Sequence, residues 1–295
     1  MLCTIISANN IYGCYRASDA DVDCFLKTHK NDLIWYNKLE DVECNLIFQL
    51  KSTATIKNLK IHNISSNEVL PKSIYNGISY MTLRYDVLFG YSKLIPEIVG
   101  NFDIKKSLDM PKIQTDLSPP YLVVHIADVV TYCLYTESEC KFMGDSPIGI
   151  KFIRNLIDYD TLNIDKMLNI GDNSTVDFLI SDIYKDGYDS VGLPKNCIAA
   201  SLAKASCAEY CAKEDLFKSL IIAFAFDITH HAIIYAQMNG LDTIAYLGDL
   251  VNVENVCKII HFAAMFRSSM GVNSAFFKYP QYIAPLGMAE IGETN

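Results

Sequence analysis

Short apolar runs alternate with polar clusters through the first third of the chain. Each run holds β-branched or aromatic residues and is bounded by Asn, Asp, Ser or Lys, a pattern typical of β-strands. A helix is expected after Asp86, through residues 92–95. The pattern predicts strands at residues 2–7, 11–16, 33–36, 46–50 and 56–61.

Consecutive prolines interrupt this pattern in the stretch Asp116-Leu117-Ser118-Pro119-Pro120. Proline disfavours helical backbone in the residue before it, so the stretch favours an extended linker. We therefore place a lobe boundary here. The N-terminal, strand-rich lobe is predicted at residues 1–118 and the C-terminal lobe at residues 119–295.

Beyond the linker, strand and helix patterns alternate. The clearest helix spans residues 213–238, where apolar residues recur at every fourth position and Asn239-Gly240 supplies a C-terminal stop. The alternation indicates an α/β lobe. The other predicted elements are strands at 121–126 and 129–135, mostly helix after Ile153, a strand at 243–247, a helix at 253–266, a strand at 275–277 and a short closing helix.

Charge and composition narrow the class of protein. The 295 residues include 25 Lys and Arg against 34 Asp and Glu, a formal net charge of −9, which excludes a basic nucleic-acid binder as the default reading. With 51% apolar residues the chain buries a large core. The length suggests about two domains.

Membrane and export signals are weak in the sequence. The most apolar run, residues 220–226, is followed by Asp227, His230 and His231, well short of the ~18 apolar residues that a spanning helix needs. The N-terminus lacks a basic region followed by a long apolar one, so no signal peptide is expected. Ten scattered cysteines without a CxxC pair favour a reducing compartment, and we expect a cytoplasmic protein.

Two pairs of side chains are of types that bind metal ions. His230 and His231 are adjacent, so on a helix they point about 100° apart. Cys207 and Cys211 lie one helical turn apart, but no further ligand is suitably spaced. We read the histidines as structural or surface residues and the cysteines as core residues, and we predict no metal site from either pair.

Several ordered motifs follow residue 120. Together they resemble the eukaryotic-type (type II) pantothenate kinases, whose signature runs D-I-Y, Y, G-L-P and A-S-S before a long helix. The matching residues are Leu122-Val123-Val124-His125-Ile126, Gly144-Asp145-Ser146 with Gly149 and Phe152, Asp182-Ile183-Tyr184, Tyr188, Gly192-Leu193-Pro194, Ala199-Ala200-Ser201, Lys213-Glu214-Asp215-Leu216, Tyr246-Leu247-Gly248-Asp249 and Tyr282 to Gly287.

The resemblance implies a fold and a chemistry. It implies an α/β, actin-like (ASKHA, ribonuclease H-like) kinase of two lobes, with ATP and Mg²⁺ in the cleft and a dimer built around the helix that begins at Lys213. The family phosphorylates pantothenate in coenzyme A synthesis and is inhibited by acyl-CoA. Phosphoryl transfer of this kind needs backbone amides around the phosphates and a carboxylate that takes the hydroxyl proton.

The aligned loops depart from the family pattern. D-I-G-G-T is replaced by Ile5-Ile6-Ser7-Ala8-Asn9, N-I-G-S-G by His125-Ile126-Ala127-Asp128-Val129, and L-G-G-G-T by Pro147-Ile148-Gly149-Ile150-Lys151. Most glycines are lost, and a carboxylate appears where phosphate would sit. The residual positions for nucleotide or phosphate are Asn9, Asp128, Gly144, Ser146, Gly149 and Gly248.

The general base is also missing from the alignment. The family segment G-G-A-Y-K-F-E aligns with Gly77-Ile78-Ser79-Tyr80-Met81-Thr82-Leu83, so leucine stands at the position of the base. Asp86 is either a displaced base or a turn residue. Asp128 is either a Mg²⁺ ligand or a cap, and Lys151 either meets a phosphate or lies on the surface.

Three functions remain open from the sequence. The first is a pseudokinase that acts as a structural or regulatory subunit, in a homodimer or in a heteromer with a paralogue or another protein. The second is an active pantothenate kinase with diverged loops that uses ATP and Mg²⁺. The third is a module that binds acyl-CoA or pantothenate without chemistry. Loss of loop glycines beside a preserved core pattern favours the first.

Overall fold

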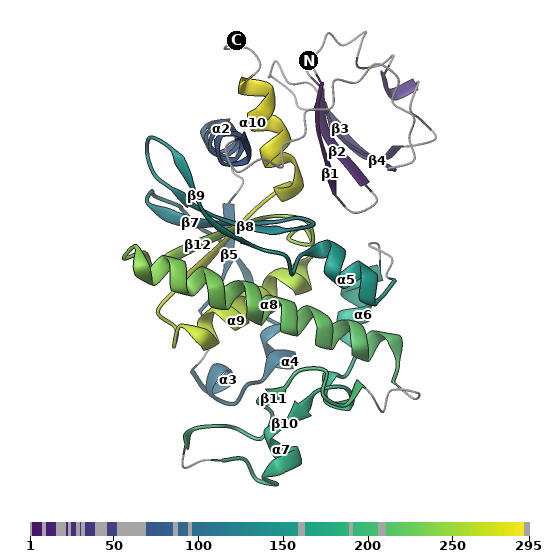
Figure 1. Ribbon diagram of the computed structural model, residues 1–295, viewed down its shortest axis with the longest axis vertical. Coiled ribbons are helices and arrows are strands. Elements are labelled where there is room, and N and C mark those ends of the chain that lie inside the picture. The colour runs from purple at the N-terminus through teal and green to yellow at the C-terminus, as the bar shows by residue number, and fades with distance from the viewer. Residues whose placement is uncertain are drawn as a thin grey trace.

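The structure is a computed structural model of the chain (Figure 1). For the N-terminal strands it describes the path of the backbone alone. These backbone segments are residues 2–7, 10–15, 33–38 and 46–51, with 83–84 and 289–291 further along the chain. Side chains are described at residues 22, 25–27, 30, 69–82, 88–93, 96–158, 163–188, 191–205 and 211–288.

The N-terminal strands form an antiparallel sheet of four strands in the order β1-β2-β4-β3. Four predicted strands are thereby confirmed, each within two residues at either end. The predicted strand at 56–61 lies outside the described residues. The strands are β1 (Leu2–Ser7), β2 (Asn10–Tyr15), β3 (Leu33–Lys38) and β4 (Leu46–Lys51).

A seven-stranded sheet forms the centre of the molecule, in the order β6-β5-β13-β12-β7-β8-β9. Strands β7, β12 and β13 are parallel, and the others pair antiparallel. The bounds are β5 (Leu88–Tyr91), β6 (Lys112–Gln114), β7 (Tyr121–Ile126), β8 (Val130–Tyr135), β9 (Cys140–Ser146), β12 (Thr243–Gly248) and β13 (Asn273–Phe277).

The connections of this sheet define its fold class. Strands β7, β8 and β9 form a meander, after which the chain returns to place β12 parallel beside β7 and β13 parallel beside β12. A meander extended in this way is the ribonuclease H-like arrangement of the actin-like fold. The predicted mixed α/β, actin-like fold is therefore confirmed.

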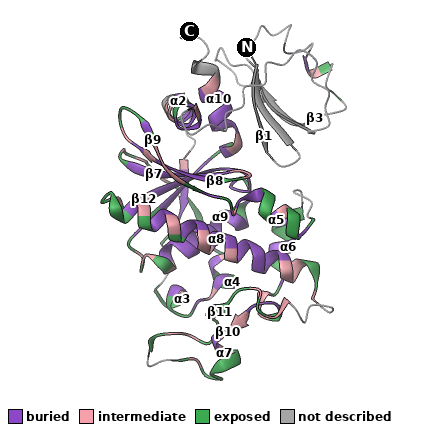
Figure 2. Cartoon of the chain, viewed as in Figure 1, coloured by how far each residue is buried: buried purple, intermediate pink, exposed green. Residues whose placement is uncertain are grey.

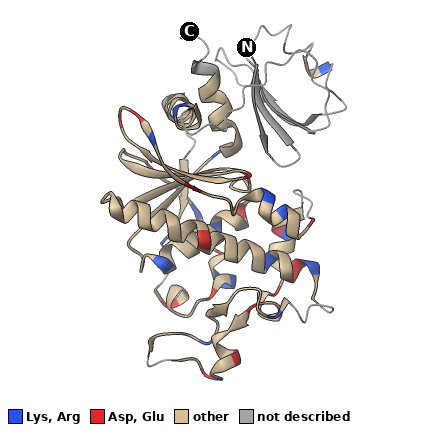
Figure 3. Cartoon of the chain, viewed as in Figure 1, with Lys and Arg blue, Asp and Glu red and all other residues tan. Residues whose placement is uncertain are grey.

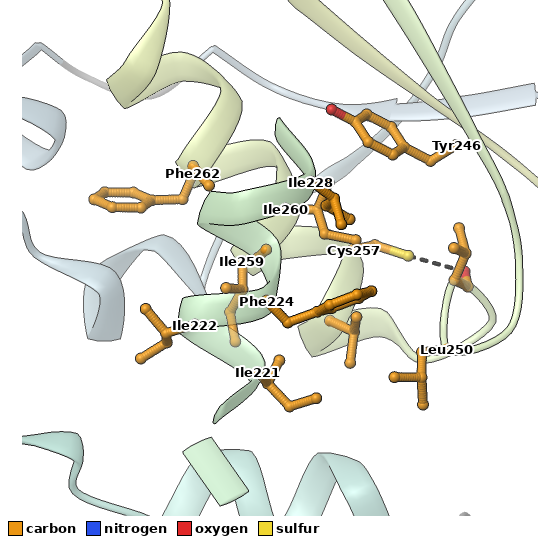
Figure 4. Packing of buried hydrophobic residues seen from close by; sticks show 14 of the residues in the cluster. Ile221, Ile222, Phe224, Ile228, Tyr246, Leu250, Cys257, Ile259, Ile260 and Phe262 are labelled. Carbon is orange, nitrogen blue, oxygen red and sulfur yellow. Dashed lines mark hydrogen bonds between the residues drawn. The ribbon is translucent and has the colours of Figure 1, made fainter. Parts of the chain in front are cut away.

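Helices α8 (Lys213–Met238) and α9 (Glu254–Arg267) cover one face of this sheet (Figure 1). Phe224 and Ile228 of α8 lie with Ile260 of α9 and Tyr246 of β12 in one apolar cluster (Figure 4). All six residues of β7 are buried, as expected for a strand covered on both faces (Figure 2). Both helices were predicted, with α8 matching its predicted bounds.

Among the described helices, α8 alone is long and apolar enough to cross a membrane by length and composition. However, 61% of its most apolar window is buried inside the protein. Its apolar residues contact the sheet and α9, which is the environment of a core helix.

Helices α2 (Val69–Arg84) and α10 (Ile283–Ile291) cover the opposite face. A ladder of tyrosine rings joins α2 to the sheet, with centroids of Tyr75 and Tyr135 5.3 Å apart and those of Tyr135 and Tyr121 4.7 Å apart. The hydroxyl of Ser79 lies 3.0 Å from that of Tyr135. These contacts fix α2 over β7 and β8.

Two glycines let α2 and α10 touch at the backbone. A Cβ at Gly287 would overlap the carbonyl oxygen of Ser73, and a Cβ at Gly77 would overlap that of Ile283. Any larger side chain at either position therefore forces the helices apart. The two helices cover this face of the sheet, with Tyr282 and Ile283 fully buried beneath them.

The structure corrects one sequence prediction and adds two elements that were not predicted. The helix expected through residues 92–95 is absent at Ser92 and Lys93, because the preceding residues form β5 and pair with β6 and β13. Residues 94–95 lie outside the described part. Helix α2 was not predicted, because the helix that it packs against lies far away in the sequence. Strand β9 was not predicted, because its polar residues obscure the alternation of apolar and polar positions.

The predicted boundary at residues 116–120 lies between two strands of one sheet. Strands β5 and β6 precede it, yet β5 pairs with β13 near the end of the chain. The division into lobes at residue 118 stays a prediction. Further described elements are α3 (Pro96–Gly100), α4 (Ile104–Ser107), α5 (Ile150–Leu156), α6 (Ile164–Ile170), β10 (Phe178–Leu179), α7 (Ile180–Ile183) and β11 (Ile198–Ala200).

The glycine contact predicts a large effect of a small substitution. Gly287→Ala should lower the free energy of unfolding by about 2 kcal/mol or more, because its methyl group meets backbone rather than a movable side chain. Gly100→Ala is the matched control, since nothing lies within 4 Å of a Cβ there. Urea denaturation measures both. Equal stability of the two variants would contradict the close packing of α2 on α10.

Two buried histidines predict how stability depends on pH. Burial lowers the pKa of His125 to about 4 and that of His261 to about 4. The unfolded chain therefore binds more protons below pH 6.5, so stability is complete above pH 6.5 and falls as the pH drops towards 4. Each histidine contributes a slope of about 1.4 kcal/mol per pH unit in that window.

Urea denaturation at several values between pH 7 and pH 4.5 measures this slope. His261→Phe should reduce it by about 1.4 kcal/mol per pH unit, because the ring beside Tyr91 no longer titrates. His230→Phe, at an exposed position of α8, should leave it unchanged. The same slope in all three proteins would show that His261 is not buried in its neutral form.

Candidate functional site

Three loops meet where the parallel strands β7 and β12 end. They are the β7–β8 turn at residues 127–129, the loop from β9 to α5 at 147–149, and the loop from β12 to α9 at 249–253. In α/β sheets, ligands bind outside the carboxyl ends of the strands. The structure brings four of the predicted site residues here: Asp128, Ser146, Gly149 and Gly248.

Gly248 is held by backbone contact. Its φ is +103°, which L side chains rarely adopt, and a Cβ there would overlap the carbonyl oxygen of Ile126. The amide of the next residue, Asp249, donates a hydrogen bond to that same oxygen, with N and O 2.7 Å apart. This glycine is therefore required for the approach of β12 to β7.

Gly149 has an equivalent role in the neighbouring loop. A Cβ there would overlap the carbonyl oxygens of Ala127 and Asp128. The amide of Ile150, at the start of α5, donates to the carbonyl of Ala127, with N and O 2.9 Å apart. The loop before α5 thus closes directly on the β7–β8 turn.

These contacts give several backbone donors of the loops an acceptor within the chain. The amides of Ile150 and Asp249 donate to carbonyls of this chain, and the amide of Ile148 donates to the hydroxyl of Ser146 at 3.3 Å. An N–H group that already has an acceptor gains little from a second one. The loops that follow β9 and β12 therefore each have backbone amides that donate to oxygens of this chain.

The charges around the loops are mostly negative. Asp128, Asp145 and Asp249 lie in or beside them, and Lys151 is an exposed cation on α5. Figure 3 shows that most of the sheet is uncharged and that charges gather on helices and loops. Among the described residues no group of three or more His, Cys, Asp or Glu is arranged to hold a metal ion.

A carboxylate of α6 accepts a hydrogen bond at the N-terminus of α9. The amide of Asn255 donates to Oδ1 of Asp165 in α6 at 3.0 Å, and Nδ2 of Asn255 donates to Oδ1 of Asn169 at 3.2 Å. A carboxylate at this end of a helix is stabilised by the helix dipole. Asp165 therefore caps the N-terminus of α9 from a neighbouring helix. Sequence reasoning missed it, because the partners are 90 positions apart.

Other predicted site residues lie elsewhere. Gly144 is inside β9, where a Cβ would overlap the hydroxyl of Tyr235 of α8, so its role is to admit that ring. Gly77 is in the middle of α2, and the position of Leu83 near its end is described for the backbone alone. Asn9 and Asp86 lie outside the described residues.

The D-I-Y signature belongs to a small unit built on α8. Asp182 of α7 forms an ion pair with Lys204, with Nζ and Oδ2 2.7 Å apart, and the hydrogen bonds from Lys204 and from the amide of Leu179 lower the pKa of this carboxyl. Deeper inside, the fully buried Asp177 accepts hydrogen bonds from Asn173 and Ser219 and from the amide of Leu202. These residues position a segment, and none of them reaches the three loops.

Known proteins match this chain along most of its length. Residues 51–290 match the family described as Fumble. The chain is 31% identical over 176 residues to 4′-phosphopantetheine phosphatase of Mus musculus, 29% identical over 181 residues to pantothenate kinase of Schizosaccharomyces pombe, and 32% identical over 183 residues to pantothenate kinase 1 of Oryza sativa subsp. japonica. Each match covers 57% of this chain.

The matches to the curated relatives cover 22%, 45% and 27% of their lengths, respectively. Among solved structures, glucokinase of Balamuthia mandrillaris in complex with glucose aligns over 99% of this chain and 93% of its own, with 11% identity and a TM-score of 0.43. A ParM hybrid protein of Bacillus thuringiensis with ADP aligns over 65% of this chain and 27% of its own, with 10% identity and a TM-score of 0.31.

The sheet order and the loops at its carboxyl edge define a protein of the actin-like class. Within that class the family match covers well over half of the sequence. The chain belongs to the Fumble family, the type II pantothenate kinases, as its motifs predicted.

The cap at α9 predicts a specific loss of stability. Asp165→Ala should lower the free energy of unfolding by about 1–2 kcal/mol, because it removes the acceptor of the Asn255 amide and a charge at the helix N-terminus. Asp158→Ala, at an exposed position before α6, should change it by less than about 0.5 kcal/mol. Chemical denaturation compares the two. A loss in both variants alike would contradict the capping role.

Proposed function

We propose that this chain is a pseudokinase of the type II pantothenate kinase family that acts as a structural or regulatory subunit. The observation that carries the proposal is the state of the loops at the carboxyl edge of the sheet. Their amides donate to Ala127, Ile126 and Ser146 instead of facing a ligand. ATP and Mg²⁺ do not fit this arrangement well, so no phosphoryl-transfer step is assigned to it.

Electrostatics supports the same conclusion. Asp128 stands at the tip of the β7–β8 turn, where the family carries a serine between two glycines. Two like charges 4 Å apart repel each other by about 1 kcal/mol even at the dielectric constant of water, and by more near a protein surface. A triphosphate beside Asp128 and Asp249 would therefore bind weakly unless a cation intervened.

The aligned position of the general base supports it too. Leucine at position 83 cannot accept a proton, and the aligned segment is part of α2, whose backbone touches α10 at Gly77. This segment of α2 packs against α10, so we assign it a structural role. No residue of this chain is assigned a catalytic role.

A kinase fold that lacks its catalytic site can still bind another protein, so we propose a role in assembly. Ile234 and Met238, near the end of α8, are 41% and 75% exposed, beside the exposed His230. We propose a homodimer, or a heteromer with a paralogue or another protein, in the cytoplasm. The apolar residues on the outer face of α8 are its expected contacts.

One observation favours an active kinase instead. Asp128 and Asp249 both follow parallel strands at the carboxyl edge of the sheet, and carboxylates there are the type of ligand that Mg²⁺ prefers. In that reading the diverged loops bind ATP with Mg²⁺, and Asp128 replaces a lost metal ligand. Binding of acyl-CoA or pantothenate without turnover is the third outcome.

Thermal shift with ATP and Mg²⁺, paired with a pantothenate phosphorylation assay on the same sample, tests the proposal. We expect no change in Tm and no product, because binding to the native state alone would raise Tm. The Schizosaccharomyces pombe pantothenate kinase is the positive control. A shift together with product would establish the active kinase, and a shift with pantothenate or acyl-CoA alone would establish the binding module.

A further inference from the structure

Two tyrosine side chains are buried between the central sheet and α8. Tyr132 of β8 and Tyr246 of β12 both pair in register with Val124 of β7, so they flank it in one row across the sheet. The two tyrosines are 1% and 0% exposed and belong to the apolar cluster that includes Ile228 of α8 (Figure 4). Because valine is the shorter side chain, both tyrosines extend beyond Val124 into the layer between sheet and helices.

Helix α8 brings a carboxylate to the same place. The ring centroid of Tyr132 lies 6.1 Å from that of His231, and Asp227 precedes His231 by one helical turn, with Oδ1 of Asp227 3.8 Å from Nδ1 of His231. Asp227 is also the neighbour of Ile228 along the helix. Electrostatics agrees with this geometry. Burial, followed by the charge of Asp227, raises the pKa of Tyr132, and burial, followed by Tyr132, raises the pKa of Tyr246.

Three buried oxygens of this group have no hydrogen-bond partner among the residues whose side chains are described. They are Oη of Tyr132, Oη of Tyr246 and Oδ2 of Asp227. Buried polar atoms in folded proteins are nearly always hydrogen-bonded, because the loss of water around them is costly otherwise. The two hydroxyl groups can donate a hydrogen bond and the carboxylate can accept one. A small molecule that both accepts and donates would satisfy all three.

We propose that an internal water molecule binds between β8, β12 and α8. It accepts a hydrogen bond from the hydroxyl of Tyr132 and from that of Tyr246, and it donates one to Oδ2 of Asp227. An internal water typically makes about three hydrogen bonds to polar groups that lack other partners, which matches this set. The negative charge of Asp227 disfavours an anion at the same position.

The water gives α8 a fixed position on the sheet. Apolar contacts such as that of Ile228 have little directional preference, whereas a hydrogen bond depends on both distance and angle. A polar network in which every member has its partner therefore specifies one arrangement of helix and sheet. The site anchors the half of α8 on which Ile234 and Met238 are exposed.

A crystal structure of the whole wild-type chain, at a resolution that shows ordered water, tests the proposal directly. We expect one density peak at about 3 Å from each of the three oxygens of Tyr132, Tyr246 and Asp227. A peak that contacts fewer than three of them, a direct hydrogen bond between any two of them, or no peak between them would overturn the proposal.

Oxygen-17 relaxation dispersion of the solvent tests the site in solution, because it detects water molecules that stay bound longer than the protein takes to tumble. The double variant Tyr132→Phe, Tyr246→Phe keeps both rings and removes both hydroxyl groups, and it should lose the signal of one long-lived water. Tyr184→Phe, at a position that is 44% exposed, is the matched control and should keep the wild-type signal. Equal signals from the two variants would contradict the site, and the wild-type crystal structure decides where the double variant does not fold.

Discussion

The contact of α8 with the seven-stranded sheet is the interaction on which the rest of the structure depends. Phe224 and Ile228 lie with Tyr246 and Ile260 in one apolar cluster, which holds the parallel pair β7 and β12 in place (Figure 4). Burial of such side chains contributes about 1.5–3 kcal/mol each. Because these strands are fixed, the loops that follow them are fixed as well.

Those loops show that a retained glycine need not mark a ligand site. Gly149 and Gly248 survive in this chain because backbone carbonyls lie where a Cβ would be. Under the proposed function, Ala127 and Val129 replace glycines that would serve only a bound phosphate and that have no such contact to preserve them. Backbone packing alone can therefore require a glycine, as it does at Gly149 and Gly248.

Sequence patterns predicted the elements with strong local signals. Helix α8 was found from its apolar periodicity, and β7 from a continuous apolar run. Helix α2 was missed because its stability comes from α10, about 200 positions away, through Gly77 and Gly287. The same limit applies to the site, where Gly149 and Gly248 were predicted, but the cap from Asp165 depends on a contact that no local pattern records.

Hydrogen exchange at the loop amides tests the central claim most directly. We predict slow exchange at the amides of Ile150 and Asp249 in the free protein, with no change when ATP and Mg²⁺ are added, because their acceptors are the carbonyls of Ala127 and Ile126. Rapid exchange in the free protein that slows on addition of ATP and Mg²⁺ would contradict it, since these amides would then be donors to a nucleotide.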